Sequence, residues 1–214
     1  MAWSVWQQRN KIRVQQPSWP LHGISSRAKD VVVEFFDIHK QPPRSAVQTS
    51  LVRWTKPPVD FYKANFEAAL FNNCNVASLG VVIRDCNGNI IGALSQKIAF
   101  PQSVEHAEAL AASRAVTLAR ELNLFKVIFE GDCLRIIKAI NTKEACHTLF
   151  GHIIEEIRSL SSSLLSYSFQ HIRREGNNLA QALARRAVVF VDTGVWVEEI
   201  PTDLEDVFQL NLVQ

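Results

Sequence analysis

The chain has 214 residues, of which 47% are hydrophobic and 21% charged, and its formal net charge is +2. This length suits one well-packed domain with an appendage, and the composition is that of a globular rather than a disordered chain. Because the charge is close to zero, any surface for nucleic acid must come from local clustering of basic residues.

No apolar run approaches the roughly 18 residues that span a bilayer. The N-terminal residues lack the apolar core of a secretory signal. The four cysteines form neither a C-x-x-C pair nor a zinc-ligand spacing. We therefore expect an intracellular protein without a membrane partner, with nucleus and cytoplasm both open. The sequence does not indicate an oligomeric state.

The first 57 residues differ in pattern from the rest. A helix is expected at 26–39, and a stretch containing Pro42-Pro43 and Pro57-Pro58 follows. Consecutive prolines neither continue a helix nor enter a central strand, so this stretch is interpreted as a linker. We expect an N-terminal helical segment with its linker at 1–57, a main domain at 58–190 and a C-terminal tail at 191–214.

The main domain begins with three apolar runs of strand length, at 62–71, 76–84 and 89–98. Asn87-Gly88 separates the second from the third, and both residues tolerate positive φ. This pattern predicts three consecutive antiparallel strands, the last two joined by a tight hairpin.

Helical and strand patterns then alternate. Apolar residues at helical spacing follow Ser103, a residue suited to cap a helix, and a short strand is expected at 125–129. Asp132 opens a second helix, and a third, a strand at 167–173 and a closing helix at 177–189 follow. The order βββαβααβα predicts an α/β fold with a mixed five-stranded sheet covered by helices.

Four polar residues in apolar surroundings are candidates for a crevice of the kind that forms at the ends of strands in α/β sheets. Glu67 is in the middle of the first strand, Glu108 is in an alanine-rich helix, Asp132 follows a strand and Gln181 is in the last helix. Each acid also has an ordinary explanation, as an outward-facing strand residue, an exposed helix residue or a helix N-cap. Their joint occurrence on distant segments indicates a shared site.

Five motifs resemble those of the ribonuclease-H-like domains carried by plant non-long-terminal-repeat retroelements and their domesticated relatives. They are Lys63–Ala69 (K-x-N-x-D-G/A-A), Gly80–Gly88 (G-x-V-I-R-D-x-x-G), Ala107–Ala111 (A-E-A-x-A), Val127–Cys133 (V-x-x-E-x-D-S/C) and His171–Ala180 (H-V-x-R-E-x-N-x-x-A). The resemblance runs from about Trp54 to Val189. It implies a ribonuclease-H-like fold, with helices on both faces of the sheet, in a fragment of a longer polyprotein.

The resemblance also implies hydrolysis of the RNA strand of an RNA–DNA hybrid with two divalent ions, Mg²⁺ or Mn²⁺, which favour oxygen ligands. Glu67, Glu108 and Asp132 match the metal-binding catalytic acids, and Gln181 matches the fourth catalytic position. Glu67 replaces an aspartate, and moving a carboxylate by about 1 Å can cost on the order of 10²-fold in rate. Gln181 offers a neutral oxygen where a charge is usual, so we expect weakened activity.

Two neighbouring residues are further candidates for a role at this site. Glu175 is an acid that can compensate for the missing charge. His171 can assist product release or carry a proton, although a histidine at the end of a strand is more often structural.

A basic cluster formed by Arg173, Arg174, Arg185 and Arg186 surrounds the last strand and helix. Phosphate contacts require only such charges, and Arg173, Arg174 and Asn177 are the candidates for contact with nucleic acid. A solvated helix face explains the same arginines equally well.

Three hypotheses follow. The first is a Mg²⁺-dependent RNA–DNA hybrid endoribonuclease of weakened activity. The second is a catalytically inactive module that binds nucleic acid or protein, and the third is a foldable relic.

Overall fold

The structure is a computed structural model that describes residues 9, 11, 13–15, 54–142, 144–146, 148–188 and 193–212. The chain divides into two compact units, Met1–Ser50 and Leu51–Gln214. The helix expected at 26–39 and most of the expected linker lie outside the described residues. In the described part of the chain, no helix is both long and apolar enough to cross a membrane.

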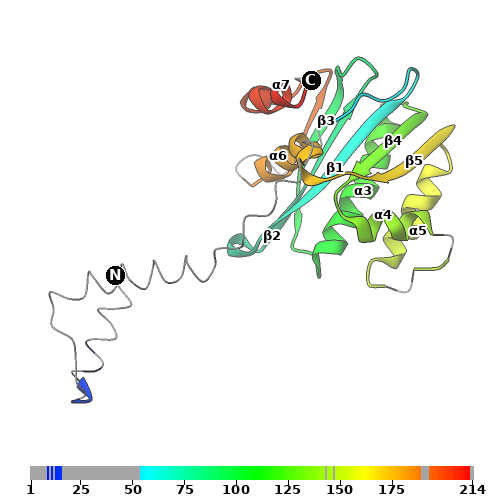
Figure 1. The fold of residues 1–214 in the computed structure, drawn as a ribbon. Helices are drawn as coiled ribbons and strands as arrows, with labels where there is room; N and C mark the ends of the chain where they lie inside the picture. The colour runs from blue at the N-terminus through cyan, green and yellow to red at the C-terminus, as the bar shows by residue number, and fades with distance from the viewer. Residues whose placement is uncertain are drawn as a thin grey trace, which may run out of the picture. The chain divides into compact units, whose positions relative to one another are not determined.

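The second unit is a mixed sheet with helices (Figure 1). Its strands are β1 (Tyr62–Phe71), β2 (Val76–Arg84), β3 (Ile90–Ala99), β4 (Lys126–Gly131), β5 (Ser166–His171) and β6 (Thr193–Val197). Its helices are α3 (Val104–Glu121), α4 (Leu134–Asn141), α5 (Gly151–Ser161), α6 (Asn178–Arg186) and α7 (Glu205–Leu212), with 3₁₀ turns η2 (Asn72–Cys74), η3 (Arg174–Gly176) and η4 (Thr202–Leu204). The predicted α/β class and the five predicted strands are confirmed.

The sheet has the strand order β5-β4-β1-β2-β3-β6. Strand β1 pairs in parallel with β4, and β4 in parallel with β5. The remaining neighbours are antiparallel. Strand β1 therefore lies at the boundary between the antiparallel and the parallel half of the sheet. Its neighbour β4 follows helix α3 in the chain.

The prediction of five strands was one too few. Residues 193–197 of the expected tail form β6, which pairs with β3 from Gln96↔Thr193 to Gly92↔Val197. Arg186 of α6 donates to the Asp203 carboxylate at 2.9 and 3.0 Å and lies 5.2 Å from the centre of the Trp196 ring. These contacts tie residues of the expected tail to the last helix.

Two apolar clusters cover the two faces of the sheet, which confirms helices on both (Figure 1). On one face, α3, α4 and α5 pack on side chains such as Phe66 and Phe129. On the other, α6 and the segment around η4 pack on Val82 and Ala93. Alternate residues of a strand point to opposite faces, which is why neighbours in β2 belong to different clusters.

The connection between β2 and β3 differs from the predicted tight hairpin. Gly88 has φ 94°, whereas Asn87 is not among the residues with positive φ. The Asp85 carboxylate instead accepts hydrogen bonds from the backbone N–H groups of Asn87 and Asn89, each at 2.8 Å. The aspartate side chain therefore organises a longer loop, which a two-residue Asn-Gly turn would not need.

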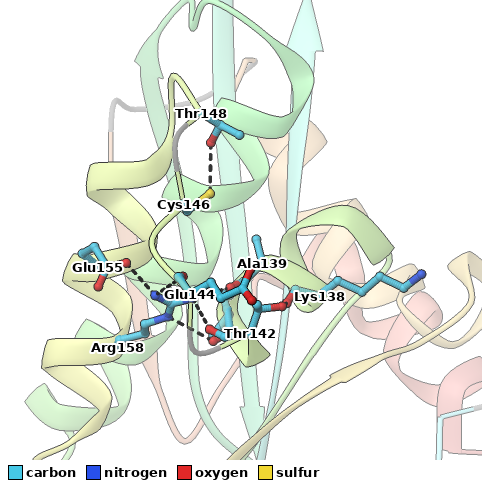
Figure 2. A network of polar contacts seen from close by, with 9 residues as sticks. Lys138, Ala139, Thr142, Glu144, Cys146, Thr148, Glu155 and Arg158 are labelled. Atoms are coloured by element: carbon cyan, nitrogen blue, oxygen red, sulfur yellow. Dashed lines mark hydrogen bonds and ion pairs between the residues drawn. The ribbon is translucent and has the colours of Figure 1, made fainter.

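The chain leaving α4 is held by Arg158 of α5 (Figure 2). Its guanidinium donates to the main-chain carbonyls of Ala139, Ile140, Thr142 and Glu144 and pairs with the Glu155 carboxylate at 2.5 Å. The last carbonyls of a helix have no partner within it, and a cation there also suits the helix dipole. Arg158 thus joins α4 to α5.

Helix α6 approaches β2 most closely at Gly80. A Cβ added there would lie 2.1 Å from the Ala180 carbonyl oxygen and 2.4 Å from the Ala184 nitrogen. Both neighbours are backbone, so the helix itself would have to move. The absence of a side chain at Gly80 thus sets the height of α6 above the sheet.

Gly80→Ala is expected to lower the free energy of unfolding by about 3 kcal/mol, because overpacking against backbone is not relieved by a rotamer change. Gly92→Ala is the matched control, since its nearest neighbour is the flexible Leu122 side chain at 2.6 Å. Urea unfolding of both variants measures the difference. Equal losses at the two glycines would contradict this account of the β2–α6 contact.

Candidate metal and catalytic site

The unequal lengths of β1 and β4 create an open position beside the central strand. Their parallel pairing ends at Asn65↔Glu130, while β1 continues to Phe71. Glu67 therefore lies just beyond the last paired residue, and Asp132 directly follows the end of β4. Side chains at the carboxyl end of a parallel strand commonly converge on such a crevice.

The structure brings together the three acids predicted from the sequence. One carboxylate oxygen each from Glu67, Glu108 and Asp132 lies within 4.8 Å of the other two. Glu67 is 5% and Glu108 3% exposed, so neither is an outward-facing surface residue. The N-cap of α4 is Cys133, so Asp132 does not have the alternative role of a helix cap.

Hydrogen bonds from buried groups hold two of these carboxylates. Asn177 donates through Nδ2 to Glu67 Oε2 at 2.8 Å and to the Phe66 carbonyl at 2.9 Å. Glu108 Oε1 accepts from the Ala68 N–H at 3.4 Å. Asn177 is only 1% exposed, and its hydrogen bond positions the Glu67 carboxylate.

A buried polar network lies one step further from the opening, on the same strands. Glu130 accepts from Lys63 Nζ at 2.9 Å and from Asn65 Nδ2 at 3.0 Å, and Asn65 Oδ1 accepts from Arg84 at 2.9 Å. The Trp54 ring covers Arg84, whose carbon Cζ lies 3.7 Å from the ring centre. Because Asn65 and Glu130 precede Glu67 and Asp132 by two residues, this network fixes the strands that carry the acids.

These supporting residues had no role assigned from the sequence. Their signal was the period of two along β1, which places Lys63, Asn65 and Glu67 on one face. Arg84 is fully buried, and its burial lowers its pKa to about 9 although Glu130 opposes the shift. A charge buried at this depth is retained only where partners compensate for lost hydration.

Gln181 lies at the same hollow but contacts a cation. With its amide oxygen facing Arg174, it accepts from Arg174 Nε at 2.6 Å and from Nη2. Both residues line a hollow of about 470 Å³ together with the three acids and Arg185. The oxygen that was expected to serve an ion is therefore engaged by a guanidinium.

The other candidates lie around this hollow. A ring nitrogen of His171 is 3.0 Å from the Asp132 carbonyl oxygen, a contact that fits the structural alternative. Glu175 and Arg173 are exposed, and neither is among the residues that line the hollow. Arg186 is committed to Asp203, so the predicted basic cluster leaves Arg174 and Arg185 beside the acids.

Burial and mutual repulsion disturb the titration of the acids. Burial, followed by the charge of Asp132, raises the pKa of Glu67 to about 8, although Asn177 and Arg174 oppose the shift. Burial and then the charges of Glu67 and Asp132 raise the pKa of Glu108 well above its ordinary range. Ionising all three groups together is therefore unfavourable without an added positive charge.

The arrangement fits a hard divalent cation. The ligand atoms that the three acids offer are all oxygens, the type that Mg²⁺ and Mn²⁺ prefer. Glu108 is one of the three converging carboxylates, and its Oε2 is buried and has no hydrogen-bond partner. Buried polar atoms of this kind are usually satisfied, which makes an ion an apt partner.

Comparison with known proteins agrees with the fold. Residues 65–187 match the family model described as reverse transcriptase-like. The chain belongs to this family. No curated protein sequence matches the chain.

Among solved structures, the similar ones include ribonucleases H. RNase H1 from the halophilic archaeon Halobacterium salinarum aligns over 60% of this chain and 98% of its own, with 22% identity and a TM-score of 0.56. LC11-RNase H1, isolated from compost, aligns over 61% and 97%, with 22% identity and a TM-score of 0.55. Its complex with an RNA/DNA hybrid aligns over 60% and 96%, with 23% identity and a TM-score of 0.52. At these identities the likeness shows a ribonuclease-H-like fold.

Without divalent ions, the free energy of unfolding is expected to fall as pH rises from about 4.5 to about 8. The pKa of Glu67 is 4.5 as a free side chain and about 8 here, so in this window the folded protein keeps a proton that the unfolded chain releases. This contribution is complete below the unfolded pKa and is lost through the folded one. Urea unfolding in EDTA across the window measures the slope.

Glu67→Gln should flatten that slope, because an amide does not titrate. Glu156→Gln, an exposed glutamate of α5, is the control and should leave it unchanged. A stability that rises between these pH values in the natural chain would contradict the raised pKa.

Proposed function

We propose that this protein is an RNA–DNA hybrid endoribonuclease of ribonuclease-H type whose activity depends on a divalent metal and is weakened by its ligand set. The observation that carries the proposal is the convergence of Glu67, Glu108 and Asp132, with ligand oxygens within 4.8 Å of one another. The family match over residues 65–187 supports it. We further propose, from the five sequence motifs, that the chain descends from a plant non-long-terminal-repeat retroelement.

Each acid has a part in this chemistry. Glu67, Glu108 and Asp132 would hold Mg²⁺ or Mn²⁺, and such ions, when bound, activate water and stabilise charge on the leaving oxygen. Asn177 keeps Glu67 from rotating away, since it fixes one of the two carboxylate oxygens. A carboxylate held in this way loses less conformational freedom on binding, which favours a preorganised site.

Arg174 and Arg185 supply positive charge where a phosphodiester backbone would approach the acids. Contacts of this kind fix the position of a nucleic acid without reading its sequence. We propose that Arg173 extends the contact, since it is exposed beside Arg174. Recognition would follow the shape of the hybrid and its 2′-hydroxyl groups. The LC11-RNase H1 structure solved with an RNA/DNA hybrid supports this choice of substrate.

A second candidate is a catalytically inactive module that still binds nucleic acid. Two observations favour it: Glu67 is one methylene longer than the aspartate of the family motif, and the Gln181 oxygen is engaged by Arg174. Both affect the chemistry but leave the positive charges of the hollow in place.

The natural chain is expected to cleave the RNA strand of a labelled hybrid slowly with Mg²⁺ or Mn²⁺. Glu67→Asp combined with Gln181→Asp should raise the rate by about 10²-fold, because about 1 Å in the placement of a catalytic group has an effect of that order. Glu108→Gln should abolish cleavage while keeping nearly the same shape. Gel analysis of the RNA products measures all three, with Glu156→Gln as the matched surface control.

Cleavage of the hybrid by the natural chain, and none of double-stranded DNA, is the outcome that the proposal requires. If neither the natural chain nor the double variant cleaves, but both shift the hybrid in a low-salt gel, the binding module replaces the nuclease. If the hybrid is neither cleaved nor bound, both functions are excluded.

A further inference from the structure

The hollow beside the acids contains a cation that the protein itself provides. Arg174 comes from η3 and Gln181 from α6. With the Gln181 amide turned so that its oxygen faces Arg174, this oxygen accepts from two nitrogens of the guanidinium. Paired N–H···O contacts fix both the position and the plane of a guanidinium. Arg174 is therefore held at the hollow, although it is an exposed residue.

The charge of Arg174 acts on the acids. Arg174 lines the same hollow as the three carboxylates, so its positive charge opposes their mutual repulsion. Three ionised carboxylates carry three negative charges, and Arg174 reduces the sum to two. One divalent cation then balances the remaining charge. A fourth carboxylate in the place of Gln181, with no guanidinium beside it, would leave four negative charges and room for two such ions.

The ligand atoms also indicate a single divalent cation. Glu108 belongs to the three converging carboxylates, and its Oε2 is buried without a hydrogen-bond partner, so this residue offers a free ligand atom for one ion. Gln181 lines the same hollow, and its oxygen, when turned toward Arg174, is already engaged by that guanidinium. A second ion near Gln181 would lose that ligand and meet a positive charge in its place.

We propose that the three carboxylates bind a single divalent cation and that Arg174, held by Gln181, supplies the second positive charge beside the scissile phosphate of a nucleic acid. This deepens the proposed nuclease and rests on it for the identity of the anion. Arg174 then has two parts: it prevents uptake of a second ion and offers its N–H groups to a phosphate oxygen.

The count of bound Mn²⁺ tests this without any measurement of activity. The full chain is titrated with Mn²⁺ alone at about pH 8.5, by calorimetry for stoichiometry and by electron paramagnetic resonance for coupling between ions. The natural chain should take up one ion with an uncoupled spectrum. Glu108→Gln should weaken that binding at least tenfold, which would locate the ion at the acids.

The variant Arg174→Gln with Gln181→Asp should bind two ions that show magnetic coupling, because the guanidinium is removed and a fourth carboxylate is added. Gln181→Asp alone should still bind one, since the new carboxylate would pair with Arg174. Arg120→Gln, at the exposed end of α3, is the matched control for the loss of one positive charge and should bind one. Circular dichroism establishes that each variant is folded.

Two coupled ions in the natural chain, or no ion at all, would overturn the proposal, as would a single ion in the folded Arg174→Gln, Gln181→Asp variant. The hybrid assay gives a separate answer. If the natural chain binds one ion but does not cleave the hybrid, the one-ion site stands and the nuclease function is excluded. If it binds two ions and cleaves the hybrid, the nuclease function stands and the one-ion site is excluded.

Discussion

The repulsion among three carboxylates is the constraint around which the site of this domain is built. Glu67 and Glu108 are almost fully buried beside Asp132, an arrangement that opposes folding unless protons, cations or hydrogen-bond donors compensate. The fold supplies two hydrogen-bond donors, the Asn177 amide and the Ala68 N–H, and the positive charge of Arg174. The proposed metal site therefore depends on surrounding structure that holds three mutually repelling carboxylates close together.

The supports for these acids come from different parts of the sheet. On β1 and β4, the buried network around Glu130 holds the two strands in register immediately before the acids. On the face covered by α6, the close approach at Gly80 places the helix that carries Gln181, and Asn177 directly precedes this helix. The position of the acids is thus determined by backbone packing as much as by their own hydrogen bonds.

Much of the fold was predictable because its signals are local. The five predicted strands, and the apolar faces of the four helices α3 to α6, follow from periodicities of two and 3.6 along the sequence. The sixth strand was missed, because Thr193–Val197 contains a glycine, pairs through backbone atoms with the edge of β3 and leaves Val195 and Val197 exposed. The hairpin was misjudged for a related reason: Asp85 accepts from the backbone of a longer loop, and composition alone favoured a shorter turn.

The acids of the site were predictable from the motifs, whereas their partners were not. The hydrogen bond from Asn177 to Glu67 was not predicted, because a motif does not reveal on which side of a short turn a side chain is buried. The contact between Gln181 and Arg174 joins residues of different elements and depends on the orientation of both side chains. Arg84 and Trp54 meet only because the chain before β1 folds back over the sheet. Each of these is a property of the tertiary arrangement.

The most direct test of the central claim is a crystal structure of the protein grown with Mn²⁺ and measured at a wavelength where manganese scatters anomalously. We predict an anomalous peak from a Mn²⁺ ion that is bound by carboxylate oxygens of Glu67, Glu108 and Asp132. A map with no peak among these side chains, or with the three carboxylates turned away from one another, would contradict a metal site at the end of β4.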